Sequence, residues 1–229
     1  MRKVLVVAAH PADEVLACGG TIAAHIKAGD EVLTLILGEG VTARDERRDP
    51  QKRGNELLSL RQQCEKAAAI LGHNKPIMLG LPDNRFDTVD LLDIIKAVEA
   101  VKKEFDPAIV YTHSACDLNV DNVLTNRAVT AAFRPLPASK AEGLFTFEVP
   151  SNTEWGGGRI GFLPNYFVDI SSTISAKLAA LAVYAGEVQK APHPRCPERI
   201  RALAEWRGSS VGFTAAEAFY CVWQRGRIG

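Results

Sequence analysis

The first half of the chain alternates short apolar runs with longer stretches in which apolar residues recur every three to four positions. The run at residues 4–9, VLVVAA, is continuous and rich in β-branched residues, which is typical of a parallel strand buried on both faces. Glycine and proline residues separate the segments. On this basis we predict strands at residues 4–9, 32–37, 76–79 and 108–112, and helices at residues 21–28, 56–71, 89–105 and 121–132.

The second half has a less regular pattern. We predict strands at residues 144–149, 166–170 and 219–224, helices at residues 174–188 and 197–206, and a glycine-rich loop at residues 152–161. Strands that alternate with helices favour a Rossmann-like α/β fold, with a doubly wound and mostly parallel sheet and right-handed crossovers. Because no repeat, low-complexity tract or linker interrupts the sequence, we expect a single three-layer α/β/α domain spanning residues 1–229.

Polar side chains cluster after the first and the fourth predicted strands. His10, Asp13 and Glu14 follow the first strand, and the second cluster comprises His113, Asp117, Asn119, Asp121 and Asn122. Ligands of open α/β sheets bind beyond the carboxyl ends of the strands, and a strand order of 3-2-1-4 would bring the two clusters face to face. A histidine and an aspartate three residues apart on a proline turn can both point at one ion. A third ligand from the second cluster would complete a three-ligand catalytic metal site.

Each cluster also has a purely structural interpretation. A single histidine such as His10 is more often a structural residue, and the segment from Asp117 to Asn122 is also typical of a polar turn that caps a helix. The presence of both clusters at neighbouring strand ends favours a functional site over either structural interpretation.

The sequence resembles the zinc-dependent N-deacetylases of the PIG-L/LmbE type over most of its length. Residues 9–14 (AHPADE) and 18–21 (CGGT) resemble the family's first motif, AHPDDE…GCGGT. Residues 80–85 (GLPDNR) resemble its middle loop, and residues 112–122 resemble its late motif, THxxxDLNxDH. The resemblance implies removal of the acetyl group from an N-acetylglucosamine-type sugar or sugar conjugate, with zinc as cofactor. The CGG run has an equally weighted second interpretation, since small residues also allow close packing of a helix on a strand.

The resemblance also implies roles for individual residues. His10, Asp13 and Asn122 occupy the positions of zinc ligands, and Asp121 matches the carboxylate beside the third ligand. The positions implied or predicted to contact substrate are Arg61, Asp83, Asn84, Asn119 and Trp155. Trp155 is included because an indole can stack on a sugar face, although such a residue is equally typical of a core or an interface.

Two positions depart from the family pattern where the chemistry occurs. Ala12 stands at the position of the general base, normally Asp, and Asn122 stands at that of the third zinc ligand, normally His. Loss of a general base commonly costs about 10²–10⁴-fold in rate, and a neutral amide is a weaker zinc ligand than imidazole. We therefore expect weak or absent zinc binding and impaired hydrolysis. The nearby groups left for acid–base chemistry are Asp121, His113 and Glu14, with Asp13 as a further candidate if it holds no metal.

Three interpretations stay open on these grounds. In the first, the chain is a relative that has lost hydrolysis and either binds a sugar or nucleotide sugar or serves as a scaffold for a partner. In the second, it is an inactivated version of a working enzyme. In the third, it is an enzyme that hydrolyses its substrate with other groups. The pair Ala12 and Asn122 is the feature that separates catalytic from non-catalytic interpretations.

Composition narrows the possible partners and compartment. Lys plus Arg and Asp plus Glu both number 27, so the basic excess typical of a nucleic-acid-binding protein is missing. Five cysteines without a CxxC pair predict reduced thiols in a cytoplasmic protein rather than a disulfide framework or a cysteine zinc site. The apolar run at residues 4–9 is too short to span a membrane. We expect an N-acetylated small molecule as the partner and no nucleic acid or membrane, and the sequence is compatible with a homo-oligomer.

The segment at residues 41–53 is polar and crowded with charges. We predict a solvated loop or a mobile flap. Its basic residues could cradle a diphosphate, although a charge run of this kind is more often a solvated loop.

Overall fold

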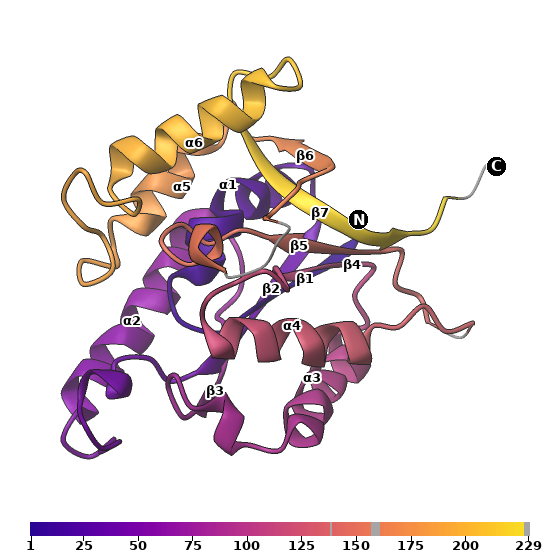
Figure 1. Ribbon diagram of the computed structural model, residues 1–229. Helices are drawn as coiled ribbons and strands as arrows, with labels where there is room; N and C mark the ends of the chain where they lie inside the picture. Colours follow the sequence, from indigo (N-terminus) through magenta and orange to yellow (C-terminus); the bar gives the residue numbers. More distant parts are fainter. Residues whose placement is uncertain (138, 157–160, 227–229) are drawn as a thin grey trace.

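The computed structural model describes residues 1–137, 139–156 and 161–226. These residues form a sheet with the strand order β3-β2-β1-β4-β5-β7-β6 (Figure 1). The strands are β1 (Lys3–Ala8), β2 (Glu31–Gly38), β3 (Ile77–Leu81), β4 (Ile109–His113), β5 (Gly143–Phe147), β6 (Tyr166–Asp169) and β7 (Ala216–Gln224). β1 to β5 are parallel, whereas β7 is antiparallel to both of its neighbours. The predicted doubly wound, mostly parallel sheet is confirmed, and its first four strands have the order 3-2-1-4.

Helices cover both faces of the sheet (Figure 1). They are α1 (Asp13–Lys27), α2 (Gly54–Leu71), α3 (Leu91–Phe105), α4 (Val120–Ala132), α5 (Ile174–Leu181) and α6 (Pro197–Ser209), with short 3-10 turns η1 (Thr42–Arg44), η2 (Phe86–Thr88) and η3 (Thr153–Trp155). Apolar side chains of α3 and α4 pack on one face, and those of α1, α2, α5 and α6 pack on the other. None of the described helices combines the length and the apolar character that a membrane crossing requires.

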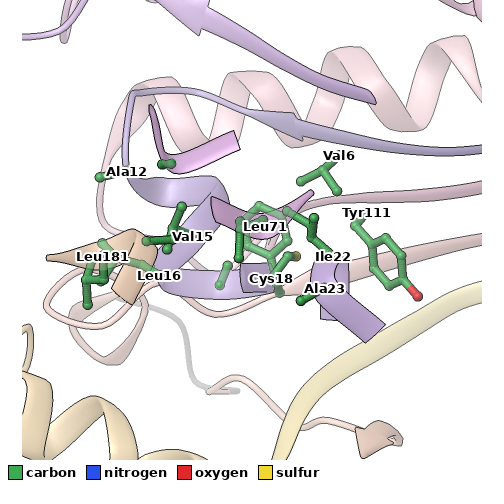
Figure 2. Close-up of a cluster of buried hydrophobic side chains, with 14 of the residues drawn as sticks. Val6, Ala12, Val15, Leu16, Cys18, Ile22, Ala23, Leu71, Tyr111 and Leu181 are labelled. Carbon is green, nitrogen blue, oxygen red and sulfur yellow. The ribbon is translucent and has the colours of Figure 1, made fainter. Parts of the chain in front are cut away.

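The continuous apolar run of β1 is explained by burial on both faces. Val4 and Val6 belong to the core cluster beneath α1, whereas Leu5 and Val7 belong to the cluster beneath α3 and α4. Figure 2 shows part of the first cluster, in which Ile22 of α1 lies near Val6 and Tyr111 and Val15 lies farther along the helix, beside Leu16. Two helix layers therefore enclose β1, and its carboxyl end opens toward the polar residues that follow it.

Two predicted helix boundaries were wrong. The first helix begins at Asp13 rather than at residue 21, because Gly19 and Gly20 lie inside it instead of preceding it. A Cβ atom at Gly20 would meet Ile170 at 2.8 Å, so the close approach of α1 to its neighbour requires a glycine there. Close packing of α1 is thus enough to explain the glycines of the CGG run. The helix predicted at residues 174–188 ends at Leu181. The apolar pattern continues beyond that residue because Tyr184 is also buried, although the chain there is no longer helical.

A buried ion pair lies where α1, α5 and β7 meet. The Lys177 Nζ atom donates to Glu217 Oε1 at 2.5 Å and to the Leu16 carbonyl at 2.8 Å. Both Glu217 oxygens also accept backbone N–H groups, from Gly20 at 3.0 Å and Thr21 at 2.6 Å. Each side chain of the pair is only 4% exposed. The carboxylate therefore joins the last core strand to the middle of α1.

Asp30 forms a second buried polar link, between the start of β1 and the turn after α1. It accepts the Arg2 backbone N–H at 2.8 Å, the Arg2 guanidinium at 3.0 Å and His25 Nδ1 at 2.8 Å. Burial opposes the charged carboxylate, but these hydrogen bonds outweigh it and lower the pKa of Asp30 to about 2.

We expect Asp30→Asn to lower the free energy of unfolding at pH 7 by about 2 kcal/mol. The folded pKa lies below the unfolded value near 4, so the contribution is complete above pH 4 and is lost as the pH falls through 2. Urea unfolding at pH 7 and pH 3 measures the difference between the chain and the variant. That difference should shrink at pH 3, whereas the exposed Asp87→Asn variant should match the unchanged chain at both values. A difference that grows in acid would contradict the account.

Candidate functional site

A polar pocket of about 320 Å³ lies at the carboxyl ends of the parallel strands. Its lining comes from the turn after β1, the loop after β2, α2, the loop after β3, the N-terminus of α4, the loop after β5 and the segment after α5. His10 and Asp13 line it from the first cluster, and Asn119 lines it from the second. The two clusters therefore lie at the same edge of the sheet, with Asn119 as the member of the second cluster in the described lining. We call this cavity the strand-end pocket.

Ala12 lies at the turn between β1 and α1. It is the N-cap residue of α1 and adopts a left-handed conformation, with φ of 80°. Its side chain is fully buried and belongs to the apolar cluster beneath α1 (Figure 2). A left-handed alanine costs about 1 kcal/mol, and Asp and Asn adopt this conformation more readily. The backbone at this position therefore suits the residue that the family pattern has there better than it suits alanine.

His10 lies against three carboxylates. Its Nε2 is 2.9 Å from Asp121 Oδ2 and 3.4 Å from Asp83 Oδ1, and its Nδ1 is 3.4 Å from Asp13 Oδ2. Burial alone would lower the pKa of His10, but the hydrogen bonds to Asp121 and Asp13 and the surrounding negative charge raise it to about 10. The imidazole is therefore charged at neutral pH and presents a cation to the pocket.

The Asp121 side chain forms hydrogen bonds with several neighbouring groups. Its fully buried carboxylate accepts the backbone N–H groups of Asn84 at 2.7 Å and Phe86 at 2.9 Å, in addition to His10. The Asn119 side chain accepts the Asp121 backbone N–H at 2.9 Å as the cap of α4, and its amide donates to Asn84 Oδ1 at 2.7 Å. Asp121 thus fixes the β3–η2 loop and the His10 ring, which makes it an orienting group.

The other two predicted catalytic residues are buried outside the described lining of the pocket. His113 is fully buried, and its Nε2 accepts the Ala9 backbone N–H at 2.8 Å, so its proton sits on Nδ1. Burial lowers the pKa of His113 to about 4. Glu14 accepts the Tyr184 hydroxyl at 2.5 Å, and burial raises the pKa of Glu14 to about 7. Neither residue is part of the described lining of the strand-end pocket.

Asp13 does face the pocket, but its carboxylate is strongly stabilised as an anion. One oxygen accepts the His10 backbone N–H at 3.2 Å and lies 3.6 Å from His113 Nε2. Burial would raise the pKa of Asp13, but the hydrogen bond to His10 and the charges of His10 and Arg195 lower it. A carboxylate with a lowered pKa accepts a proton poorly.

The donor atoms present do not fit the zinc site that the resemblance implies. The side chain of Asn122 is fully buried, and among the described residues neither its Oδ1 nor its Nδ2 has a hydrogen-bond partner. Amide oxygens suit hard cations such as calcium or magnesium better than zinc. A different group, His10, Asp83 and Asp121, places ligand atoms within 4.8 Å of one another and is able to hold a metal. In that group, however, both carboxylates already accept backbone N–H groups.

Among the predicted substrate contacts, Asp83, Asn84 and Asn119 line the pocket. Arg61 is exposed on α2, and Trp155 is 68% exposed in η3; the described lining includes neither. The sequence interpretation missed Asn152, Glu187 and Arg195, which line the pocket from loops of the second half. No local sequence pattern marks Arg195, because contacts with residues distant in the sequence, such as Pro150 and Ser151, hold its side chain.

Two of the four arginines in the charged segment at residues 41–53 are neutralised by nearby carboxylates. Arg48 makes a bidentate pair with Glu39 at 2.7 and 2.9 Å, and Arg53 makes one with Asp45 at 2.7 and 2.9 Å. Arg44 instead lines the pocket. The segment is therefore a flap tied by ion pairs, and a cradle made of all its arginines does not form.

Comparison with known proteins places this site in a family. The sequence pattern of the family described as PIG-L, GlcNAc-PI de-N-acetylase, matches residues 5–133, which is more than half of the chain and includes both polar clusters. The chain belongs to the PIG-L family. A diacetylchitobiose deacetylase from Thermococcus kodakarensis is 27% identical over 225 residues, which cover 95% of this chain and 82% of that protein.

The PIG-L family relatives do not all carry the same activity in their names. A 4-oxalmesaconate hydratase from Pseudomonas putida is 30% identical over 202 residues, covering 81% of this chain and 74% of that protein. The crystal structure of a 4-carboxy-2-hydroxymuconate hydratase from Pseudomonas putida superposes with a TM-score of 0.79 at 25% identity, and covers 100% of this chain and 99% of that one. The fold and the family are thus established, and the residues of the pocket decide the reaction.

Proposed function

We propose that this PIG-L family member binds an N-acetylated sugar or sugar conjugate in the strand-end pocket and hydrolyses its amide slowly at most. The observation that carries the proposal is the buried methyl group of Ala12, at the position that the resemblance assigns to the proton acceptor. The amides of Asn84, Asn119 and Asn152 support the binding half of the proposal, because they line the pocket and pair well with sugar hydroxyls.

The remaining acidic and basic groups support slow hydrolysis. A general base works best with a pKa near the operating pH and within hydrogen-bond reach of the attacking water. Asp13 faces the pocket with a lowered pKa, and His10 is a cation. Glu14 and His113 are not part of the described lining, and they form hydrogen bonds with Tyr184 and with the Ala9 backbone, respectively. Among the described residues, no other carboxylate or imidazole therefore stands where the family pattern has its proton acceptor.

Weak or absent zinc binding is part of the same proposal. Zinc, when bound in such a site, would polarise an amide carbonyl and acidify a water molecule. With an amide at position 122, His10 and Asp13 would be the two strong ligands, one fewer than a catalytic zinc site needs.

The experiment is a titration of the purified chain with N-acetylglucosamine, followed by NMR, with acetate release measured in the same tubes after zinc addition. We expect saturable binding and acetate release at least about 10²-fold slower than from a PIG-L family deacetylase assayed in parallel. Saturable binding with acetate release at the rate of that deacetylase would contradict impairment, and the absence of binding would contradict the sugar site.

A second candidate reaction is hydration of an unsaturated carboxylic acid, as named for the relative from Pseudomonas putida. The observation that favours it is the presence of Arg44 and Arg195 in the pocket lining, since guanidinium groups bind carboxylates. Loss of the ultraviolet absorbance of 4-oxalmesaconate on incubation with the chain would support hydration over sugar binding.

A further inference from the structure

One carboxylate joins two arginines across the strand-end pocket. Glu187 Oε1 accepts Arg44 Nη2 at 3.1 Å, and Glu187 Oε2 accepts Arg195 Nη1 at 3.0 Å. Arg44 belongs to the flap after β2, whereas Glu187 and Arg195 belong to the segment between α5 and α6. All three line the pocket. The two guanidinium groups are therefore spaced so that a single carboxylate bridges them.

Arg195 is held in place independently of Glu187. Its Nε donates to the Pro150 carbonyl at 3.1 Å and to Ser151 Oγ at 2.8 Å. The side chain is only 15% exposed, whereas that of Arg44 is 52% exposed. A planar guanidinium fixed by its Nε still presents its terminal amino groups, so Arg195 is preorganised to bind an anion.

The charges around the pocket are unevenly placed. Asp13 and Asp83 lie around His10, at the end formed by the first and third strands. Arg44 and Arg195 face one glutamate, which leaves an excess of one positive charge around Glu187. An anionic group of a ligand would be repelled by the aspartates and attracted to the two arginines.

We propose that Arg44 and Arg195 form an anion subsite for a carboxylate or phosphate group on the ligand, and that this group replaces Glu187. The inference rests on the proposed function, because it specifies the substrate class as an anionic N-acetylated sugar conjugate. Glu187 occupies the subsite in the free protein and gives way to an anion of similar shape. Displacement leaves Glu187 in solvent, at low cost for a side chain that is already 24% exposed.

The test uses calorimetric titrations with three sugars: neutral N-acetylglucosamine, N-acetylmuramic acid with its carboxylate, and N-acetylglucosamine 1-phosphate. The last two distinguish a carboxylate from a phosphate as the preferred group. Succinate and inorganic phosphate are titrated alone, so that the subsite is measured without the sugar. The variants are Arg195→Gln, Arg44→Gln and Glu187→Gln, and the control is the exposed flap variant Arg47→Gln.

We expect the unchanged chain to prefer an anionic sugar over N-acetylglucosamine, and Arg195→Gln to reduce that preference about 10-fold. Arg44→Gln should reduce it less, because Arg44 is more exposed. Glu187→Gln should increase the affinity for the anions several-fold, since the competing carboxylate is gone. Arg47→Gln should match the unchanged chain. If Arg195→Gln does not fold, the Arg44→Gln and Glu187→Gln variants still test the subsite, because both side chains are partly exposed to solvent.

The outcomes separate this inference from the proposed function. Equal affinity for neutral and anionic sugars, unchanged in Arg44→Gln and Glu187→Gln, would overturn the anion subsite and leave the sugar pocket standing. Binding of succinate or phosphate that depends on Arg44, without any binding of sugars, would support the subsite and overturn the proposed sugar function. Weaker anion binding in Glu187→Gln would show that Glu187 only holds the two arginines in position. That result would overturn the proposal that the ligand's anionic group replaces Glu187.

Discussion

The double variant Ala12→Asp/Asn122→His is expected to bind zinc and to release acetate from N-acetylglucosamine at least about 10²-fold faster than the unchanged chain. It carries the residues that the family pattern has at both positions. The backbone accommodates the first change, since the left-handed N-cap favours Asp over Ala. At position 122, an imidazole replaces an amide whose buried atoms have no partner among the described residues. Zinc content by mass spectrometry and acetate release by coupled assay measure both effects.

The matched control is Ala12→Asn/Asn122→His. Its amide has the shape of the aspartate and suits the same left-handed backbone, but it accepts no proton from water. This control should bind zinc, but its rate of acetate release should stay at the level of the unchanged chain. Equal rates for the two double variants would contradict the assignment of position 12 as the missing proton acceptor. Zinc binding without cleavage of any N-acetyl sugar by the Asp variant would contradict the substrate class.

Lys177→Met is expected to lower the free energy of unfolding by about 3 kcal/mol. The substitution keeps the length of the side chain but leaves the buried Glu217 carboxylate without its cation. The energy comes from this uncompensated charge, because Glu217 keeps its hydrogen bonds to α1. Urea unfolding followed by circular dichroism measures the change.

Two further variants show whether burial is the cause. Lys177→Met/Glu217→Leu should lose less stability than the sum of the single changes, since the orphaned charge is gone. Lys75→Met removes an ion pair to Glu65 whose lysine is 78% exposed, and should alter stability by at most about 0.5 kcal/mol. Equal losses for Lys177→Met and Lys75→Met would contradict a structural role for the buried pair.

The fold was predictable where one physical requirement dominates a segment. β1 is predictable as a buried parallel strand because each of its faces meets a helix layer, and the alternation of elements predicts a doubly wound sheet but leaves the strand order open. The start of α1 was not predictable in this way. Gly19 and Gly20 look like helix breakers in the sequence, and only the contact with Ile170 explains why they lie inside a helix.

The site divides along similar lines. His10, Asp13 and Asn119 were predictable because polar residues at the ends of buried strands converge at one edge of a sheet. The orienting role of Asp121 was not, since it depends on backbone N–H groups from a distant loop. Arg195 and Glu187 were missed because long-range packing, rather than local pattern, brings their segment to the pocket.

The central claim, a sugar pocket without its proton acceptor, is tested most directly by a crystal of the unchanged chain soaked with N-acetylglucosamine and zinc chloride. The account predicts an intact N-acetyl sugar in the strand-end pocket, within hydrogen-bond distance of Asn84 or Asn152, with no tightly held zinc on His10, Asp13 and Asn122. A fully occupied zinc ion on those three residues, with glucosamine in place of the acetylated sugar, would contradict it.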